Sequence, residues 1–198
     1  MKILAISMSP RAKGSTVTLL EKALEGAREA GAETELYSVA GKKIEGCDGC
    51  WGCAKTGQCH IKDDMQGLYD KMVAADGIIF GMPIYFYGMS AQAKTVMDRT
   101  MCLNKPERSL MNKVGAVTVD CGSLGLVDAL KDWYFYIVSR RMIPANQVAA
   151  YAVDLPSLEK CMQAALEQGK QMVAIAKQGF KYPPEYTART IAYGTHTK

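Results

Sequence analysis

The residues best suited to chemistry are four cysteines in one short stretch of the chain, Cys47, Cys50, Cys53 and Cys59. They are separated by two, two and five residues, and glycines at positions 46, 49, 52 and 57 allow the stretch to fold back on itself. Overlapping two-residue gaps are typical of a loop that holds an iron–sulfur cluster, whereas zinc ribbons usually take their ligands from two separate Cys-x-x-Cys pairs. The spacing therefore favours a cluster, with a structural zinc ion or reduced thiols as the alternatives.

The remaining cysteines, Cys102, Cys121 and Cys161, stand alone in the sequence. An odd total of seven, with four close together, is a poor basis for a disulfide framework. A group of this kind is more typical of metal binding or redox chemistry in a reducing compartment, so we expect a cytoplasmic protein. Cys161 falls on an apolar helix face and is interpreted as a buried hydrophobic residue.

Length and composition indicate one globular domain with a sizeable core. The 198 residues include 48% hydrophobic and 22% charged residues, and the net charge of +4 is spread along the chain. A nucleic-acid-binding protein would show a clustered basic face, and a membrane helix would need about 20 consecutive apolar residues. Neither pattern is present. The N-terminal apolar run is short and lacks a small-residue cleavage site, so it is interpreted as a first strand rather than a signal peptide.

Buried strands alternate with amphipathic helices along the chain. The strands are predicted near residues 2–7, 35–39, 77–82, 114–120 and 147–152, and the helices over 15–30, 65–73, 90–97, 124–140 and 158–177. Ser15 or Thr16 is expected to cap the first helix, Asp63 and Gln66 to form a capping box for the second, and Ser90 to cap the third. The alternation predicts an α/β fold with a doubly wound, five-stranded parallel sheet.

In such a sheet, ligands bind beyond the carboxyl ends of the strands. The loop after the first strand carries hydroxyl groups and cations just before a helix, and this combination favours phosphate binding, with an ordinary capped turn as the alternative. Neither a Walker motif nor Gly-x-Gly-x-x-Gly occurs there. The loop after the third strand, Met82–Met89, offers aromatic side chains that suit a planar heteroaromatic ring and are costly to expose uncovered. The loop Asp120–Ser123 could supply a further edge to that ring.

These segments together resemble a known family. The resemblance lies in Ser9-Pro-Arg-Ala-Lys-Gly-Ser-Thr, in the cysteine stretch followed by Ile61-Lys-Asp-Asp-Met, in Pro83-Ile-Tyr-Phe and in Lys94-Thr-Val-Met-Asp-Arg. In this order they look like the flavodoxin-like NADPH-dependent FMN reductase family, and most like its iron–sulfur flavoprotein branch. The resemblance covers residues 1–180, and the ordered combination is far more specific than any single motif.

The resemblance implies two cofactors. The FMN phosphate would be bound by Ser9, Arg11, Ser15, Thr16 and Thr18. The flavin ring would lie against Pro83, Ile84, Tyr85, Phe86, Tyr87 and Gly88, and against Asp120, Cys121, Gly122 and Ser123. A 4Fe–4S cluster would be held by Cys47, Cys50, Cys53 and Cys59. The resemblance also implies a homodimer or homotetramer with active sites near the subunit interfaces.

We therefore expect an FMN-dependent oxidoreductase that passes electrons between FMN and a 4Fe–4S cluster. A cluster-free NAD(P)H-dependent FMN or quinone reductase, and an electron carrier that accepts electrons from ferredoxin, are the alternatives. Neither a Ser-His-Asp arrangement nor a pair of acid/base carboxylates stands out, as expected where a cofactor carries the chemistry. His60 is interpreted as a surface residue, and Asp98-Arg99 as forming an interface or intrahelical ion pair.

The chain is expected to divide into an FMN-binding domain over residues 1–180, which includes the cysteine loop, and a C-terminal tail over residues 181–198. The tail has no helical period and contains Pro183-Pro184 and several tyrosines. It is either free or docked on a neighbouring subunit, and its aromatic residues favour docking.

Overall fold

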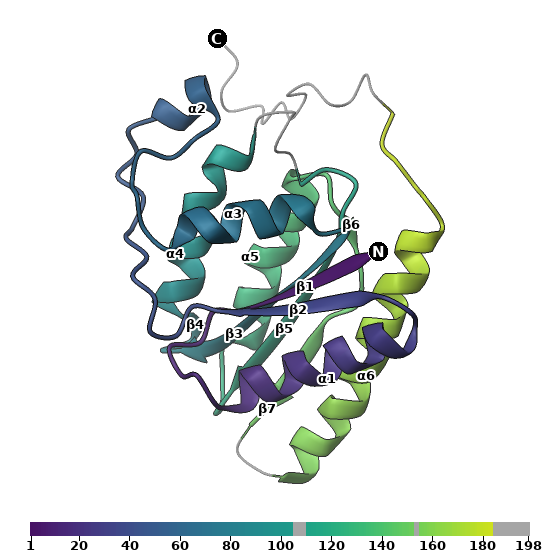
Figure 1. Cartoon of the computed structure of the whole chain (residues 1–198). Helices are drawn as coiled ribbons and strands as arrows, with labels where there is room; N and C mark the ends of the chain where they lie inside the picture. Colours follow the sequence, from purple (N-terminus) through teal and green to yellow (C-terminus); the bar gives the residue numbers. More distant parts are fainter. Residues whose placement is uncertain (105–109, 153–154, 184–198) are drawn as a thin grey trace.

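A parallel sheet lies between two layers of helices in the computed structural model, which describes residues 1–104, 110–152 and 155–183 (Figure 1). The strands are β1 (Lys2–Ser7), β2 (Glu33–Ser38), β3 (Gly77–Tyr85), β4 (Gly88–Met89), β5 (Val114–Cys121), β6 (Ile143–Pro144) and β7 (Val148–Tyr151). Their order is β2-β1-β3-β5-β6, and β7 pairs with β5 along the same edge as β6. The predicted doubly wound α/β sheet is confirmed.

The sheet has seven strands where five were predicted. The additional strands are the two-residue segments β4 and β6. β4 pairs antiparallel with the end of β3, and β6 pairs parallel with the start of β5. Two residues are too few to show a strand period, so the sequence gives no sign of them.

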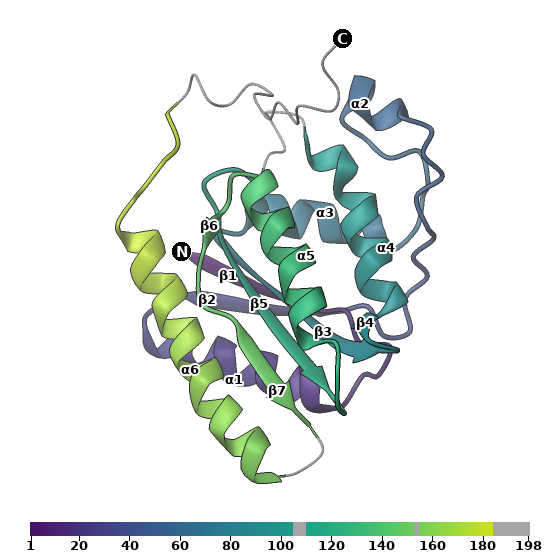
Figure 2. The ribbon, with the colours of Figure 1, turned by 180° about the vertical axis from the view of Figure 1, so that it is seen from behind.

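The helices cover both faces of the sheet (Figures 1 and 2). They are α1 (Ser15–Glu29), α2 (Gly52–Thr56), α3 (Met65–Ala74), α4 (Ala91–Arg99), α5 (Leu126–Ser139) and α6 (Leu155–Lys177), with a 3₁₀ helix η1 at Thr100–Asn104. α1 and α6 lie on one face, and α3, α4 and α5 on the other. The short helix α2 lies at one end of the molecule, within the cysteine stretch, where a loop without helix was expected.

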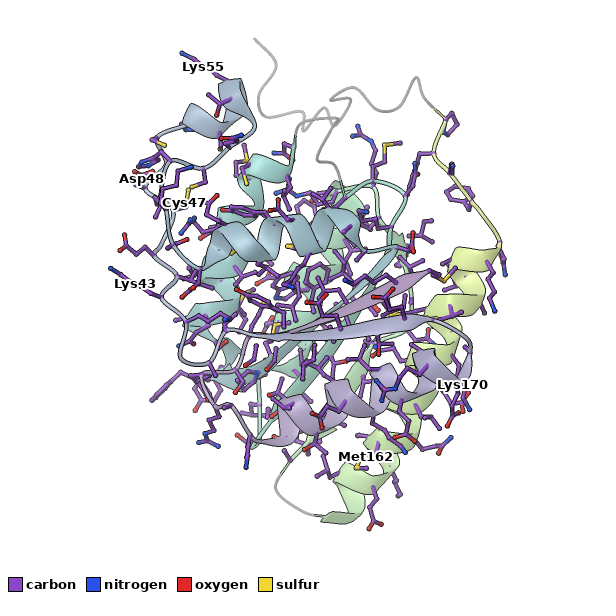
Figure 3. The ribbon with its side chains drawn as sticks, viewed as in Figure 1. Lys43, Cys47, Asp48, Lys55, Met162 and Lys170 are labelled. Atoms are coloured by element: carbon purple, nitrogen blue, oxygen red, sulfur yellow. The ribbon has the colours of Figure 1, made fainter. Side chains whose placement is uncertain are left out.

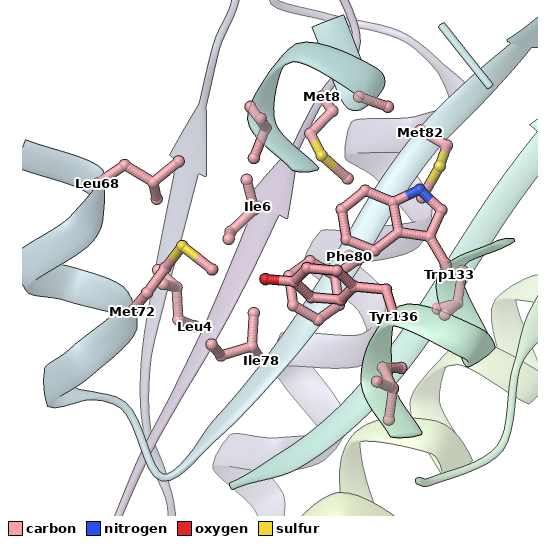
Figure 4. Packing of buried hydrophobic residues seen from close by; sticks show 14 of the residues in the cluster. Leu4, Ile6, Met8, Leu68, Met72, Ile78, Phe80, Met82, Trp133 and Tyr136 are labelled. Carbon is pink, nitrogen blue, oxygen red and sulfur yellow. The ribbon is translucent and has the colours of Figure 1, made fainter. Parts of the chain in front are cut away.

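Alternating side chains of the central strands fill two separate cores. Leu4 and Ile6 point to the side of α3 and α5, whereas Ile3 and Ala5 point to the side of α1 and α6. In the first core the ring of Phe80 stacks on Trp133, with the ring centroids 4.6 Å apart (Figure 4). Apolar burial on both faces therefore fixes the strands whose carboxyl ends carry the predicted loops.

Helices α1 and α6 approach each other through glycines. A Cβ atom on Gly26 would lie 1.9 Å from the carbonyl oxygen of Leu166, and one on Gly169 would lie 1.8 Å from that of Ala23. Real Cβ atoms do not approach backbone that closely, so both positions require glycine for this packing distance.

Two of the three predicted helix caps are wrong. α1 begins after Gly14 without a side-chain cap, because the hydroxyls of Ser15 and Thr16 donate to Asp120 instead. The reciprocal capping box of Asp63 and Gln66 does not form: the Asp63 carboxylate accepts from Arg99 and from the N–H of Met65, and the Gln66 side chain donates to the carbonyl of Ile61. The third prediction is confirmed, because the Ser90 hydroxyl accepts a hydrogen bond of 3.3 Å from the N–H of Ala93 at the start of α4.

None of the helices in the described part of the chain combines the length and apolar character needed to cross a bilayer. The predicted tail over residues 181–198 lies mostly outside the described residues. Its division from the domain and its docking on a neighbour stay predictions.

Candidate functional site

The first candidate site is a cavity of about 220 Å³ at the carboxyl ends of β1, β3 and β5, which we call the strand-end pocket. It is lined by Ser9, Arg11, Gly14, Ser15, Thr16, Pro83, Ile84, Tyr85, Asp120, Cys121, Gly122 and Ala152. Parallel strands bring their following loops to one edge of a sheet, so segments more than 100 residues apart in sequence meet here.

The start of α1 gives this pocket the character of an anion site. The first N–H groups of a helix have no acceptor within the helix, and no side chain caps those of α1. The Arg11 guanidinium and the Ser9 hydroxyl line the same cavity. Backbone donors, hydroxyls and a cation at a helix N-terminus are the groups that bind a phosphate ester, so these residues fit the phosphate end of FMN.

Among the described residues that line the strand-end pocket, Asp120 is the acidic one, and it is only 5% exposed. Its carboxylate accepts hydrogen bonds of 2.6 Å from the Ser15 hydroxyl and 2.5 Å from the Thr16 hydroxyl. Burial raises the pKa of Asp120 above its ordinary value, although the two hydroxyl donors act in the opposite direction. The end of β5 is thus tied directly to the start of α1.

The aromatic loop forms a tight hairpin between β3 and β4. Phe86 and Tyr87 occupy the two turn positions with φ of +46° and +68°, as two-residue hairpin turns require. The turn projects these side chains away from the sheet, and Phe86 is 99% exposed. In a single chain the rings therefore remain uncovered, at the rim of the pocket that Tyr85 lines.

The strand-end pocket brings together most of the residues predicted to bind FMN, although their role in binding stays a prediction. Those that line it are Ser9, Arg11, Ser15, Thr16, Pro83, Ile84, Tyr85, Asp120, Cys121 and Gly122. Those that do not are Thr18, Phe86, Tyr87, Gly88 and Ser123. The Thr18 hydroxyl instead donates to the carbonyl of Gly14, within α1's first turn.

Sequence reasoning missed two residues of this pocket, Gly14 and Ala152. Ala152 donates its N–H to the carbonyl of Cys121 over 2.9 Å, which continues the β5–β7 pairing to the pocket wall. The end of the predicted fifth strand was the available signal, since its carboxyl end falls on the same edge of the sheet.

The second candidate site is a cavity of about 320 Å³ next to the C-terminal end of α4, where Asp98 and Arg99 lie. We call it the cysteine pocket. Its lining comprises Cys47, Asp48, Gly49, Cys50, Trp51, Cys53, Cys59, His60, Ile61, Asp98, Arg99 and Met101. Gly49, Trp51 and Gly57 adopt left-handed backbone angles that turn the chain around α2, on which Cys53 lies. Figure 3 shows Cys47 and Asp48 beside α2, at the periphery of the molecule.

All four cysteines of the predicted ligand set line this one cavity. Burial, and then the neighbouring thiols of Cys59, Cys47 and Cys50, raise the pKa of Cys53. The four sulfur atoms therefore share one electrostatic environment, in which binding of a cation to the thiolates would relieve their mutual repulsion.

In the described part of the chain, one group of potential metal-ligand atoms lies within 4.8 Å, and it is formed by Asp48, Cys50 and His60. The four thiols surround the same cavity without forming such a group among themselves. Which metal the thiols would bind stays a prediction from their spacing in the sequence.

A buried ion pair lies against the cysteine pocket. Arg99 at the end of α4 donates to both carboxylate oxygens of Asp63, over 2.7 and 3.0 Å, and its side chain is fully buried. Burial would raise the pKa of Asp63, but hydrogen bonds from Arg99 and from the N–H groups of Glu45 and Met65 outweigh it and hold that pKa below its ordinary value.

The interpretation of Asp98-Arg99 is thus correct for Asp98 and wrong for Arg99. Asp98 forms an intrahelical pair with Lys94, over 2.6 Å, whereas Arg99 reaches across to the segment before α3. His60 is exposed as expected, and its Nε2 lies 2.8 Å from Asp48. Cys161 is only partly buried, at the edge of the α1–α6 core.

A family model for NADPH-dependent FMN reductases matches residues 1–153. The chain belongs to this family. The predicted family is therefore confirmed.

Two relatives carry the name iron–sulfur flavoprotein. One, from Methanocaldococcus jannaschii, is 46% identical over 129 residues, which are 63% of this chain and 65% of the relative. The other, from Methanosarcina thermophila, is 37% identical over 138 residues, which are 67% of this chain and 72% of the relative. The first match thus spans just under two thirds of the relative's length.

Among solved structures, a flavodoxin, WrbA-like protein from Agrobacterium tumefaciens superimposes with a TM-score of 0.66 at 18% identity. The superposition covers 89% of this chain and 98% of that one. At this identity the likeness concerns the fold, and it confirms the flavodoxin-like architecture.

Proposed function

We propose that this protein is an electron-transfer oxidoreductase with FMN in the strand-end pocket and a 4Fe–4S cluster in the cysteine pocket. The observation that carries the proposal is the convergence of four thiols on one cavity in a chain of the FMN reductase family. The names of the relatives from M. jannaschii and M. thermophila support the same pairing of cofactors.

The strand-end pocket would hold the phosphate of FMN through the N–H groups at the start of α1, the Arg11 guanidinium and the Ser9 hydroxyl. The hydroxyls of Ser15 and Thr16 would join them only by turning away from Asp120, to which they donate in this structure. The ring would lie along Pro83–Tyr85 and the adjacent hairpin. FMN accepts electrons as a hydride and can release them one at a time. The protein's part is to bind and orient it, and to keep water from the ring.

The cysteine pocket would hold the cluster through Cys47, Cys50, Cys53 and Cys59. The thiol chemistry and the convergence of all four cysteines on one cavity support this assignment. None of the seven cysteines forms a disulfide, which is consistent with a reducing compartment such as the cytoplasm.

A second copy of the chain is proposed as the cover for the exposed flavin side. A pocket of about 220 Å³ is smaller than the about 300–1,000 Å³ typical of whole-ligand sites, which bury most of their ligand. Phe86 at the hairpin tip is exposed together with Leu124 and Val127 near the start of α5. The hairpin and this helix touch, since a Cβ on Gly125 would lie 2.4 Å from the Tyr87 carbonyl oxygen. Together they form one apolar surface suited to a homodimer or homotetramer.

A second candidate function is an NAD(P)H-dependent FMN or quinone reductase without a cluster. The name of the family favours it, since it specifies NADPH and does not require the cysteines. In this case the exposed rings at the hairpin would receive the nicotinamide or quinone, and the four thiols would have a structural role.

The proposal is tested by measuring FMN, iron, sulfide and zinc in one anaerobic preparation of the whole protein. The expected result is about one FMN and about four irons with matching sulfide per chain. Zinc in place of iron would refute the cluster, and absence of FMN would refute the flavin site. Steady-state reduction by NADPH, compared with reduction by reduced ferredoxin, then separates a reductase from an electron carrier.

A further inference from the structure

The Arg99 side chain joins the two ends of the cysteine stretch. Its guanidinium donates to the carbonyl oxygen of Glu45 over 2.7 Å and lies 3.4 Å from that of Ile61, in addition to its pair with Asp63. Glu45 precedes Cys47 by two residues, and Ile61 follows Cys59 by two. One side chain from α4 thus holds both stems of the segment that carries the four thiols.

The same guanidinium has one donor left over. Its Nε is buried and finds no acceptor among the described residues, although both terminal nitrogens are well bonded. Arg99 also lines the cysteine pocket together with the four thiols. A buried N–H without a partner is costly. The Arg99 guanidinium interacts electrostatically with the Tyr69 side chain and with the Cys59 thiol, so a thiolate or cluster sulfur at Cys59 is one acceptor that could satisfy it.

The charge of Arg99 also has a consequence for the pocket. A cluster with four thiolate ligands is an anion, and one electron added to it raises its negative charge by one, with no bond made or broken. A fixed cation close by stabilises the more negative state, and the burial of the Arg99 side chain limits how far water screens its charge. Hydrogen bonds to cluster sulfurs act in the same direction and are known to set cluster potentials.

We propose that Arg99 is a positioning residue for the metal centre of the cysteine pocket: its stem contacts fix the thiols, and its Nε–H and positive charge raise the reduction potential of the centre. This inference rests on the proposed function, since it requires a cluster in the pocket. Asp63 opposes the effect, because its carboxylate partly neutralises the guanidinium.

The test is a potentiometric titration of the anaerobic holoprotein with dithionite, with electron paramagnetic resonance of the reduced centre as the signal. Arg99→Gln should lower the equilibrium constant for one-electron reduction by about tenfold, which is about 59 mV. Asp63→Asn keeps the shape of the acceptor but removes its charge, so it should shift the potential in the opposite direction. Opposite shifts from the two partners of one ion pair are not expected of a purely structural role.

Lys131→Gln is the control, because Lys131 is an exposed cation on α5 that is paired with Asp128, and neither residue lines the cysteine pocket. Solvent screening should keep its effect below about twofold. Iron and sulfide are measured in every variant. If Arg99→Gln fails to retain the cluster, the potentials of Asp63→Asn and Arg99→Lys are compared with the wild-type value instead. Arg99→Lys keeps the positive charge but loses the planar guanidinium and its Nε–H.

The inference is overturned if iron-replete Arg99→Gln has the wild-type potential, or if Asp63→Asn shifts the potential downward or not at all. A wild-type protein that binds no iron refutes the proposed function instead, so the two failures are distinguishable.

Discussion

The two pockets are positioned by different parts of the molecule. The strand-end pocket is formed by three loops that are anchored to the sheet. The N–H of Met8 donates to the carbonyl of Gly81 over 2.8 Å, and the Ser90 hydroxyl donates to the carbonyl of Met8 over 3.0 Å. The cysteine pocket is formed mainly by one long connection between β2 and α3, which contains only the five-residue helix α2, and it is closed by the end of α4 and by Met101 of η1.

This difference separates a site that depends on the global fold from one that depends on a local contact. The loops of the strand-end pocket continue directly into β1, β3 and β5, which are buried on both faces. The cysteine stretch contacts the core mainly through Cys53, Cys59 and Ile44, and its stems are held by the Arg99–Asp63 pair. Perturbation of the core should therefore affect the first site, and loss of a ligand should affect only the second.

The largest expected effect is the loss of iron from Cys53→Ser. One missing thiolate ligand should remove most of the about four irons per chain, while FMN content and the thermal unfolding midpoint of the metal-free protein change little. Iron analysis and flavin absorbance of the same sample measure both. Cys161→Ser is the control, since Cys161 lies near Ala149 on another face and should leave iron unchanged. Parallel loss of FMN in Cys53→Ser would contradict the independence of the two pockets.

The next largest effect should come from Gly169→Val in α6. The new side chain would overlap the backbone of α1, so α1 must shift, and we expect a loss of about 3 kcal/mol of unfolding free energy in urea denaturation. FMN affinity should fall as well, because α1 begins in the strand-end pocket. Gly67→Ala in α3 is the matched control: nothing lies within 4 Å of the added Cβ, and stability should stay equal or rise by about 0.5–1 kcal/mol. Equal effects of the two substitutions would refute the tight contact.

Arg11→Gln should weaken FMN binding about tenfold, or about 1.4 kcal/mol, through loss of one charge-assisted contact with the phosphate. Fluorescence titration of the flavin-free protein measures the dissociation constant. Lys13→Gln is the comparison, because Lys13 belongs to the same loop but does not line the pocket. If the lysine variant binds as weakly as the arginine variant, the effect is one of general charge and not of a formed site.

The smallest effect concerns Asp120→Asn. The asparagine retains a hydrogen-bonding group for Ser15 and Thr16 but removes a negative charge next to the phosphate, so FMN should bind about fivefold more tightly, or by about 1 kcal/mol. Weaker binding would show that the carboxylate is needed to orient the two hydroxyls.

The pH dependence of stability in the flavin-free protein gives a second measurement of the same group. Because burial raises the pKa of Asp120, its folded form holds the proton more tightly than its unfolded form. Wild-type stability therefore falls as pH rises from the ordinary value of 3.8 through the raised one. Asp120→Asn should be the more stable protein at pH 7, and the difference should shrink toward pH 4. A difference that grows toward low pH would contradict this sign.

The sequence was sufficient to predict the five main strands and most of the strand-end pocket. Near-continuous apolar runs such as Gly77–Met82 identify buried strands, and the topology of a parallel sheet then brings their following loops together. The convergence of the four cysteines on one cavity was equally predictable, because all four lie within one local stretch; their role as metal ligands stays a prediction.

The features that were missed depend on contacts between distant residues. Ser15 and Thr16 are residue types that often cap helices. Their hydroxyls instead donate to Asp120, more than 100 residues away in the sequence, and this contact replaces the predicted cap on the N–H groups of α1. Arg99 is polar and at a helix end, so its sequence suggests exposure. Its burial becomes favourable only through Asp63, which is 36 residues distant.

The glycine contact between α1 and α6 has a consequence for the order of events during synthesis. The helix that presents its N-terminus to the strand-end pocket is made among the first 30 residues, whereas the helix that covers its inner face ends at Lys177. At a synthesis rate of about 5–20 residues per second, the early helix waits about 7–30 s for its neighbour. During this interval its apolar face and one side of the sheet are uncovered, so a chaperone that shields nascent chains would act before flavin can be loaded.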